Sequence, residues 1–389
     1  MRILQIIAGL DIGGAHGGAE RCGLELARRL AHQHSVEVCA FWQRDTLAER
    51  EWVAQLQMDG IPLFFATPVG CTRCQATYLQ GIRAINEHFQ TGLATFDIAH
   101  SHFQLGSLVA LLLRFSKTAR YALRTAHVTL EWGPGFFNSI YRMLLNGWLF
   151  PLLLDAETGV SQAVVDRLRR HAGARLAHRQ PRLIYNALPQ EIAIYRIDRR
   201  QSAQPAWWGN ITIGSIGRLT TQKDYACLLD AFAMLQPKMP GAHLLLVGEG
   251  NQRPFLEEKA RRAGIAGQVT FLGQHNDILA LMGQMDVFVL PSLWEGLPTV
   301  VLECMGSGVP VIASDIPGTR ELISHGVTGW LFPARQPARL AEIILYVLHH
   351  PVEVRQVTQV AASQLERFSL THAVDEYQKL YTELTQRIP

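Results

Sequence analysis

The sequence contains no Asp-x-Asp pair, and this absence bears on how the chain would handle a phosphate ligand. Magnesium ions at phosphate sites are usually held by one or two carboxylates. The sequence therefore gives no reason to propose a divalent metal that bridges a diphosphate. Separately, we expect no bound cofactor. The sequence also lacks zinc-finger spacing and basic runs with interleaved aromatic residues, so we expect no nucleic-acid partner.

Cysteine is scarce, with six residues in a chain of 389. Only Cys71 and Cys74 form a Cys-x-x-Cys pair, and no second pair completes a zinc site. The N-terminal apolar run 3–10 is short and passes into Gly-rich sequence, unlike a signal peptide. We therefore expect reduced thiols in a cytoplasmic protein.

No apolar run approaches the roughly 20 residues that span a bilayer. The longest apolar region, 143–154, is interrupted by Asn146, Gly147 and Pro151. One interpretation is a helix buried against a sheet. The other is a monotopic anchor giving peripheral contact with the inner membrane surface. The basic residues beside such an anchor would be Arg167, Arg169, Arg170 and Arg175.

Charge is modest overall but uneven along the chain. The formal net charge is +3, with 19 Lys and Arg against 14 Asp and Glu in residues 1–190 and 17 against 19 in residues 191–389. A mildly basic first half is compatible with an anionic acceptor, an anionic membrane surface or an ordinary solvated surface. The length favours two domains.

Strand and helix patterns alternate in two series, which predicts two doubly wound parallel sheets of the Rossmann-like α/β class. The charged, Pro- and Trp-containing stretch 190–210 separates the series and is the candidate linker. Helical patterns at 352–367 and 371–386 follow the second series. The predicted strands are 2–10, 36–42, 61–66, 96–102, 121–127, 158–161 and 183–186, then 211–216, 243–247, 269–272, 286–290, 309–313 and 329–332.

The segment from residue 286 to 303 combines a buried strand, a loop and the start of a helix. Pro298 suits the first turn of that helix, which would continue from Thr299. Glu295 would then lie at the carboxyl end of the strand, and Glu303 one to two turns into the helix. Ligands of open α/β sheets bind at this edge, and a helix N-terminus attracts phosphate. The segment therefore suits a nucleotide sugar.

Two other loops carry candidate donor-site residues. Arg218 ends the strand 211–217, and Lys223 follows five residues later, so the two cations could clamp a diphosphate. The turn Gly248-Glu249-Gly250 follows the next strand and would let backbone approach a ligand closely. Each feature alone is also common in solvated loops.

The first half offers glycines and histidines near predicted strand ends. Gly17 and Gly18 open a helix after the first strand, but their spacing is not the dinucleotide fingerprint, which argues against NAD. His100, His102 and His127 lie at or near strand ends. A histidine at such a place is often structural.

The ordered set of these motifs resembles the family-4 retaining glycosyltransferases of group 1. The set runs from Gly17-Gly18-Ala19-Glu20 through His127, Gly217-Arg218 and Lys223, and Gly248-Glu249-Gly250 to the Glu-Gly-x-Pro segment that ends at Glu303. The later Gly318, Glu321, Gly326 and Gly329 fit as well. The resemblance covers nearly the whole chain, and the Glu295–Glu303 segment is its specific part.

The resemblance implies a GT-B fold of two Rossmann-like domains facing each other across a cleft. Residues 1–190, with the C-terminal helix at about 371–389 packing back, would bind the acceptor. Residues 208–368 would bind the nucleotide sugar. Catalysis would fall to Glu295 and His127, with a weaker assignment of His102 and Asn186 to the acceptor side. The donor-binding residues would be Gly17, Gly18, Arg218, Lys223, Gly248, Glu249, Gly250, Leu297, Pro298, Thr299 and Glu303.

The expected function is metal-independent transfer of a hexosyl group from a nucleotide-diphosphate sugar, most simply a UDP-sugar, with retention of configuration. The acceptor would be a saccharide or lipid-linked molecule in cell-envelope polysaccharide or glycolipid synthesis. Two alternatives remain open, a catalytically silent nucleotide-sugar-binding protein and a nucleotide-sugar epimerase. Nothing in the sequence names the base, the sugar or the acceptor.

Overall fold

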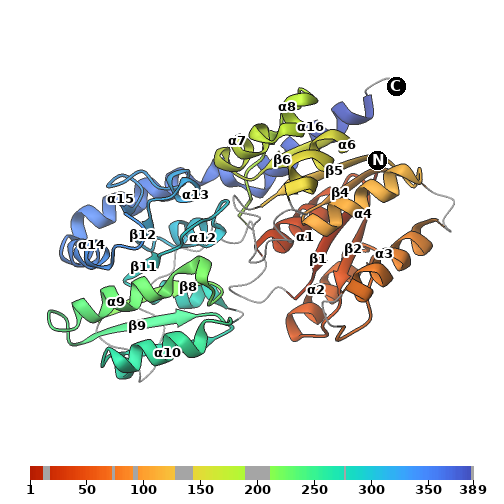
Figure 1. Cartoon of the computed structure of the whole chain (residues 1–389). Coiled ribbons are helices and arrows are strands. Elements are labelled where there is room, and N and C mark those ends of the chain that lie inside the picture. The colour runs from red at the N-terminus through yellow and green to blue at the C-terminus, as the bar shows by residue number, and fades with distance from the viewer. Residues whose placement is uncertain are drawn as a thin grey trace. The chain divides into compact units, whose positions relative to one another are not determined.

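The computed structural model describes residues 1–11, 18–71, 75–90, 95–127, 143–188, 211–275 and 277–386. The chain divides into two compact units (Figure 1). Unit 1 contains Met1–Ile12, Gly17–Ala187 and the C-terminal Leu370–Pro389, and unit 2 contains Leu188–Ser369. Both are parallel sheets with helices on their two faces. The candidate linker lies outside the described residues.

Unit 1 is built on a seven-stranded sheet in the order β3-β2-β1-β4-β5-β6-β7, with every described pairing parallel. Residues of β1 alternate between the two faces, as a strand requires: Ile3 and Ile7 join one core, and Leu4 and Ile6 the other. The strands are β1 (Arg2–Gly9), β2 (Ser35–Trp42), β3 (Leu63–Phe65), β4 (Phe96–Ser101), β5 (Ala119–Ala126), β6 (Ala156–Gly159) and β7 (Arg182–Leu183).

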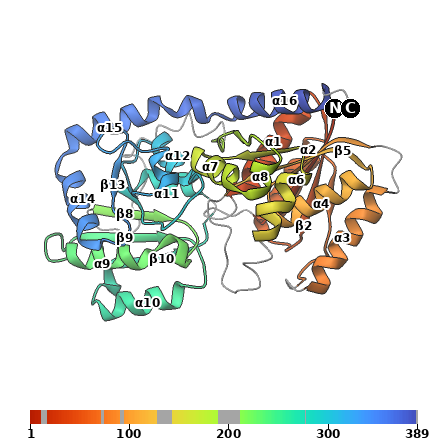
Figure 2. The same ribbon diagram turned by 45° about the horizontal axis from the view of Figure 1, so that its top comes forward.

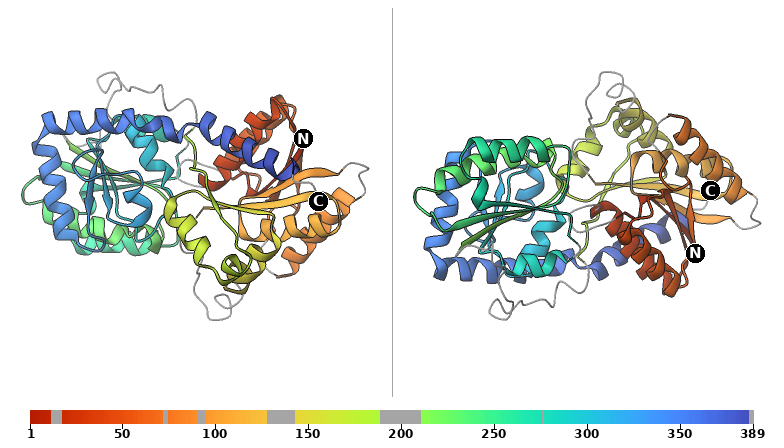
Figure 3. Two further views of the ribbon diagram at one scale, coloured as in Figure 1. Left: turned by 90° about the horizontal axis from the view of Figure 1, so that it is seen from above. Right: turned by 90° about the horizontal axis from the view of Figure 1, so that it is seen from below.

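Helices cover both faces of this sheet. On one face pack α1 (Gly18–Ala31), α2 (Leu47–Met58) and α16 (Leu370–Gln386). On the other pack α3 (Gln75–Gln90), α4 (Gln104–Phe115), the π-helical turn η1 (Leu145–Leu149) and α6 (Phe150–Leu153). The short helices α7 (Gln162–Arg170) and α8 (Ala172–Leu176) connect β6 to β7. Figure 3 shows the blue α16 beside the red α1, which it contacts.

Unit 2 has a six-stranded parallel sheet in the order β10-β9-β8-β11-β12-β13. Its strands are β8 (Ile211–Ile216), β9 (Ala242–Val247), β10 (Val269–Gly273), β11 (Val287–Leu290), β12 (Val311–Ser314) and β13 (Trp330–Phe332). Its helices are α9 (Tyr225–Leu235), α10 (Arg253–Arg262), α11 (Ile278–Gly283), α12 (Thr299–Gly306), α13 (Pro317–Arg320), α14 (Pro337–His349) and α15 (Pro351–Ser363).

The two sheets share one topology. In each, the first strand of the unit lies between its second and fourth strands, so β1 pairs with β2 and β4, and β8 with β9 and β11. The chain therefore reverses direction across the sheet at β1/β4 and again at β8/β11. Such switch points leave a crevice at the carboxyl ends of the strands, where ligands of this fold class bind.

The predicted doubly wound class is confirmed, and most predicted strands agree with the observed ones to within a few residues. The predicted strand 211–216 coincides with β8, and the predicted helix from residue 371 corresponds to α16. Within the described residues, no helix is both long and apolar enough to cross a bilayer.

Candidate active site

In unit 2, the loops after β8 and β11 meet at the switch point through a buried ion pair. Lys223 Nζ lies 2.7 Å from Glu295 Oε1, and their side chains are only 14% and 9% exposed. Lys223 ends the 3₁₀ turn η3 (Thr221–Lys223), and Glu295 lies in the loop before α12. Burying such a charged pair costs folding free energy unless its geometry is good and its remaining donors and acceptors are hydrogen-bonded.

Gln222 joins the same two loops by three hydrogen bonds. Its carbonyl oxygen accepts from Leu293 N at 2.8 Å, and its Nε2 donates to Trp294 O at 2.9 Å and to Glu295 Oε2 at 3.4 Å. Both carboxylate oxygens of Glu295 therefore have partners from the β8–α9 loop. The role of Gln222 could not be predicted from the sequence, although Gln222 directly precedes Lys223.

The start of α13 presses on the backbone of Glu295 from another side. A Cβ at Gly318 would lie 2.7 Å from Glu295 O and 2.8 Å from Gly296 O. Only glycine fits this approach without displacing the loop. The β8–α9 loop therefore holds the Glu295 carboxylate, and the start of α13 packs against the Glu295 backbone.

Arg218 and Lys223, paired as a diphosphate clamp in the sequence analysis, lie in different environments. Arg218 is exposed, and no acidic group of the described residues forms an ion pair with it. Lys223 is held against Gly217, where an added Cβ would lie 3.2 Å from Lys223 Cε and 2.9 Å from Tyr225 Oη. Burial, with a smaller contribution from the Glu295 charge, raises the pKa of the Tyr225 hydroxyl.

The helix α12 begins where the sequence predicts it, directly after Pro298. Pro298 is the N-cap residue, and no side chain caps the first turn, which begins at Thr299. The backbone N–H groups of this turn therefore carry the positive end of the helix dipole. Leu297 is buried before the turn, and Glu303 is buried farther along the helix, at 5% exposure.

The Gly248–Gly250 turn follows β9 and has mainly structural contacts. The Glu249 carboxylate forms an ion pair with Arg253, one helical turn later. Glu249 O also accepts from Leu219 N at 2.9 Å, and a Cβ at Gly250 would collide with the Leu219 backbone. The turn therefore holds the β8–α9 loop in place, and the proposed ligand contact of Glu249 would have to compete with Arg253.

In unit 1, the corresponding strand ends carry three histidines in one hydrogen-bonded network. His100 lies in β4, His102 follows β4, and His127 follows β5. His102 Nδ1 is 3.3 Å from His127 Nε2, and His102 Nε2 is 2.8 Å from the Gln5 side-chain oxygen. The C-terminal helix α16 contributes Tyr381, whose hydroxyl is 2.7 Å from His100 Nδ1.

Burial makes all three histidines neutral near pH 7. Burial lowers the pKa of His127 to about 4, and the nearby Asn186 side chain partly opposes this. The pKa values of His100 and His102 lie well below their ordinary range, again chiefly because of burial. Each ring therefore carries one proton and offers one acceptor nitrogen.

The hydrogen bonds fix which nitrogen carries the proton. The Gln5 oxygen can only accept, so His102 Nε2 must donate to it. His102 Nδ1 is then an acceptor, and His127 Nε2 donates to it. This leaves His127 Nδ1 unprotonated, and this atom is buried without a hydrogen-bond partner among the described residues.

The same network extends across the sheet to α16. His100 Nε2 is 2.7 Å from Thr125 Oγ1, which is also 2.8 Å from the Tyr377 hydroxyl and 2.7 Å from Thr158 Oγ1. The Gln5 Nε2 group donates to Tyr381 at 3.3 Å. The histidines could be identified from the sequence, but the other network members Gln5, Tyr377 and Tyr381 could not.

Two further residues of the expected site can be placed only in part. Gly17 lies outside the described residues, and Gly18 is the exposed first residue of α1. Among the described residues, no group of three or more His, Cys, Asp or Glu side chains is arranged to hold a metal ion. The expectation of metal-independent chemistry stays a prediction.

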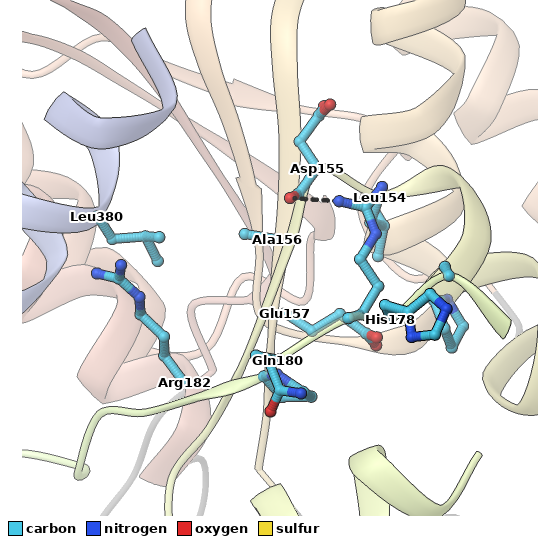
Figure 4. A pocket seen from close by; sticks show the side chains of 12 residues that line it. Leu154, Asp155, Ala156, Glu157, His178, Gln180, Arg182 and Leu380 are labelled. Atoms are coloured by element: carbon cyan, nitrogen blue, oxygen red, sulfur yellow. Dashed lines mark hydrogen bonds between the residues drawn. The ribbon is translucent and has the colours of Figure 1, made fainter. Parts of the chain in front are cut away.

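In unit 1, a cavity of about 350 Å³ lies at the amino ends of β6 and β7, opposite the strand ends that carry the histidines. Figure 4 shows Arg182 and Leu380 on one side of β6 and His178 on the other. Asp155 in its wall is already paired with Arg114 at 2.6 Å. Ligands of this fold class bind at the carboxyl ends of the strands, and the cavity lies at their amino ends, so it is not the candidate active site.

Comparison with protein families divides the chain as the units do. Residues 16–191 match the family described as Glycosyltransferase Family 4, and residues 199–364 match the family described as Glycosyl transferases group 1. EpsF of Bacillus subtilis, named as a glycosyltransferase, is 29% identical over 322 residues, which are 81% of this chain and 79% of EpsF. The Vi polysaccharide biosynthesis protein VipC/TviE of Salmonella typhi is 30% identical over 186 residues, 46% of this chain and 32% of that protein.

Solved structures show the same fold at low identity. HepE of Anabaena, in complex with UDP and glucose, has a TM-score of 0.76 and 22% identity, covering 98% of this chain and 100% of HepE. Sucrose-phosphate synthase of Thermosynechococcus elongatus has a TM-score of 0.81 and 19% identity, covering 99% of both chains. The fold is therefore that of the GT-B class, with two parallel-sheet α/β domains.

Proposed function

The chain belongs to the glycosyltransferases of group 1 and family 4, and from this premise we propose that it is a retaining hexosyltransferase that uses a nucleotide-diphosphate sugar. We propose a UDP-sugar as the donor, because HepE, which shares the fold, binds UDP and glucose. The proposed acceptor is a saccharide or lipid-linked molecule of the cell envelope, because a relative acts in Vi polysaccharide biosynthesis.

The observation that carries this proposal is the buried Lys223–Glu295 pair beside the N-terminus of α12. A diphosphate at this place would accept from Lys223 and from the backbone N–H groups near Thr299. Arg218, exposed and without an ion-pair partner in the described chain, can move to the same group. These cations stabilise the negative charge that develops on a departing nucleotide diphosphate, and this is the role a metal would otherwise fill.

The two carboxylates of the β11–α12 segment have separate proposed roles. Glu303, buried in α12, would accept from the ribose hydroxyls of the nucleotide. Glu295, at the loop, would accept from a hydroxyl of the transferred sugar. Because Lys223 and Gln222 already hold the Glu295 carboxylate, binding of the sugar would not have to order this side chain.

In the proposed reaction, the bond between the anomeric carbon and the β-phosphate oxygen breaks, and its electron pair stays on the diphosphate. The sugar becomes oxocarbenium-like. The acceptor oxygen then bonds to the anomeric carbon from the same face, which retains its configuration, and the acceptor proton passes to the departing phosphate oxygen. No enzyme nucleophile and no redox step are needed.

His127 has a proposed positioning contact with the donor sugar. Its Nδ1 atom is unprotonated, because the hydrogen bonds from Gln5 through His102 fix the tautomer. Such a nitrogen accepts from a sugar hydroxyl but cannot protonate one. We therefore assign His127 a hydrogen-bonding role and not that of a general acid. Among the described residues, Cys22, Cys39, Cys71, Cys227 and Cys304 form no disulfide, which supports a cytoplasmic location.

The test begins with thermal unfolding of the full chain in the presence of UDP, GDP, ADP and their common hexose conjugates. A bound ligand raises the unfolding temperature in proportion to its occupancy. We expect UDP and a UDP-hexose to stabilise most. Transfer is then followed by mass spectrometry with a panel of saccharide and lipid-linked acceptors.

The Glu295→Gln variant should keep UDP binding and lose turnover by about 10²-fold or more, as expected for a contact made in the transition state. The exposed Glu342→Gln variant is the matched control and should retain full turnover. Nucleotide binding without transfer or change of the donor would overturn the proposal in favour of a silent binder. Conversion of the donor alone, seen by proton NMR, would overturn it in favour of an epimerase.

A further inference from the structure

The helical segment 143–153 of unit 1 lies at the surface, and its exposed side chains are all apolar. It comprises the end of the segment before η1, η1 itself and α6. An ordinary surface helix places polar residues on its outer face. Here the large exposed side chains, with their exposed fractions, are Met143 (48%), Leu144 (51%), Trp148 (44%), Leu152 (37%) and Leu153 (36%).

The opposite face of the same segment belongs to the unit 1 core. Leu145, Phe150 and Leu154 are buried against the sheet, and Asn146 accepts from Arg124 at 2.6 Å. The segment is therefore apolar on both faces. The sequence left two interpretations open, a helix packed on the sheet and an apolar surface beside arginines. The buried face fits the first interpretation, and the exposed face fits the second.

The helix α8 extends the exposed apolar face. Helix α8 contacts η1, α6 and α7. The helices α6, α7 and α8 lie together in Figure 2. A Cβ at Gly173 would lie 2.8 Å from Trp148 O, so the backbones of α8 and η1 almost touch. Leu176, at the end of α8, is 66% exposed. We call Met143, Leu144, Trp148, Leu152, Leu153 and Leu176 the apolar face.

A strongly basic stretch adjoins the apolar face. Residues 167–182, which include the end of α7 and all of α8, hold six arginines and two histidines and no acidic residue. Arg169 has one exposed ion pair, with Asp166 at 3.5 Å. Arg170 and Arg175 are exposed and form no ion pair with any described residue.

We propose that the apolar face and the adjoining arginines form a docking surface for an anionic lipid bilayer. The apolar side chains would enter the boundary between headgroups and acyl chains, and the arginines would bind lipid phosphates. A second copy of the chain fits less well. A two-fold contact would place each copy's arginines near those of the other, where like charges repel. This proposal does not depend on the enzymatic one.

The test is flotation of the full chain with vesicles of phosphatidylcholine alone and of phosphatidylcholine mixed with phosphatidylglycerol. We expect binding to the mixed vesicles and little to the neutral ones, weakened by added salt. Absence of binding to both would overturn the proposal. So would equal binding to both, because the arginines would then contribute nothing.

The arginine contribution is tested with Arg169→Gln and Arg170→Gln together. Each arginine near an anionic surface contributes about a fivefold gain in binding, so the double variant should bind roughly 25-fold more weakly. The control replaces Arg262 and Arg355 of unit 2 by Gln, both exposed and remote in sequence, and should bind as the parent does. Equal losses in the two double variants would overturn the assignment of this surface.

The apolar contribution is tested with Trp148→Ser, which should weaken binding by about tenfold or more. Leu176→Ser is a second variant at a more exposed position, in case the first perturbs folding. Phe255→Ser, 54% exposed in unit 2, is the control and should change nothing. Unchanged binding in both Trp148→Ser and Leu176→Ser would overturn insertion of the apolar face.

Two readouts separate a bilayer from other occupants. Trp148 emission should shift to the blue on vesicle binding, and Trp148→Phe should keep binding while losing that part of the shift. Sedimentation without lipid should show the same mass for the parent and for Trp148→Ser. A parent dimer that Trp148→Ser converts to a monomer would overturn the proposal and make the face a contact between copies.

Discussion

The two units of this glycosyltransferase share one strand order but place opposite chemistry at their strand ends. Unit 2 gathers charges there, with Lys223 paired to Glu295 at 2.7 Å and Arg218 nearby in the same loop. Unit 1 gathers neutral groups there. Its histidine, threonine, tyrosine and glutamine side chains form hydrogen bonds with one another. Topology therefore sets where polar groups collect, and the local residues set what they can bind.

The difference indicates a division of labour. A charged pair responds to an anion, because an arriving phosphate attracts the cation and repels the carboxylate of the pair. A neutral network cannot respond in this way, but it holds one tautomer and one set of orientations. Under the proposed function, the charged cluster of unit 2 would bind and release a diphosphate, and the network of unit 1 would present a fixed acceptor atom at His127.

Removing Lys223 should have the largest effect on this contrast. Lys223→Met leaves the buried Glu295 carboxylate without its cation, which should cost about 3–5 kcal/mol of unfolding free energy. Turnover should fall by about 10²-fold or more. Urea unfolding and a transfer assay measure the two effects.

The matched control is Lys259→Met, which breaks the more exposed pair with Asp230 and should cost at most about 1 kcal/mol. If the two variants were equally stable, the Lys223 pair would be no more than an ordinary surface pair, and the contrast between the units would fail.

Acid should break the neutral network of unit 1. The pKa of His127 is lowered from 6.5 to about 4 in the folded chain, so between these values the unfolded chain binds a proton that the folded chain does not. Stability should therefore fall as pH falls from about 6.5 to about 4, by up to about 1.4 kcal/mol per pH unit for each such histidine.

Calorimetry across this pH range measures the slope. His127→Asn should make it shallower, whereas the exposed His349→Asn should leave it unchanged. A slope that His127→Asn does not alter would mean that other groups carry the acid sensitivity.

Removing one hydroxyl tests how far the network depends on α16. Tyr381→Phe leaves His100 Nδ1 and Gln5 Nε2 without a partner, which should cost about 1–3 kcal/mol of unfolding free energy. Tyr346→Phe removes an exposed hydroxyl that donates to Glu353, and it should cost much less. Equal costs measured by thermal unfolding would show that the buried network adds no stability of its own.

The smallest predicted effect concerns the loop contact that positions Glu295. Gly318→Ala would push its Cβ against the Glu295 and Gly296 carbonyl oxygens, so turnover should fall by about tenfold, as small misplacements in an active site can cause. Gly267→Ala, where an added Cβ meets nothing within 4 Å, is the control. Steady-state kinetics of the two variants should differ in kcat; identical kinetics would contradict a positioning role for α13.

Local sequence patterns predicted the elements of the fold well. The β-branched run before Pro291 became β11, and the helix after Pro298 begins at Thr299. Glu295 and Glu303 consequently lie where the spacing placed them, in the loop and in α12. These features depend on neighbours within one turn or one strand, which a single sequence displays.

Features that depend on distant partners could not be predicted. Tyr381 bonds to His100 across 281 residues, and Gln222 bonds to Glu295 across 73. The Glu249 carboxylate was expected near a ligand, but a neighbour four residues away already binds it. The apolar region around Trp148 showed no polar face in the sequence, and only the packed structure reveals which side is exposed.

The position of α16 in the chain affects how the protein is made. The ribosome completes the strands of unit 1 before unit 2, yet Tyr377 and Tyr381 follow unit 2 in sequence. During synthesis, His100, Thr125 and Gln5 must wait for their hydroxyl partners while all of unit 2 emerges. Domains generally fold as units during translation. Unit 2 can therefore reach its final fold while unit 1 is still incomplete, and the nascent chain must protect an unfinished core for that interval.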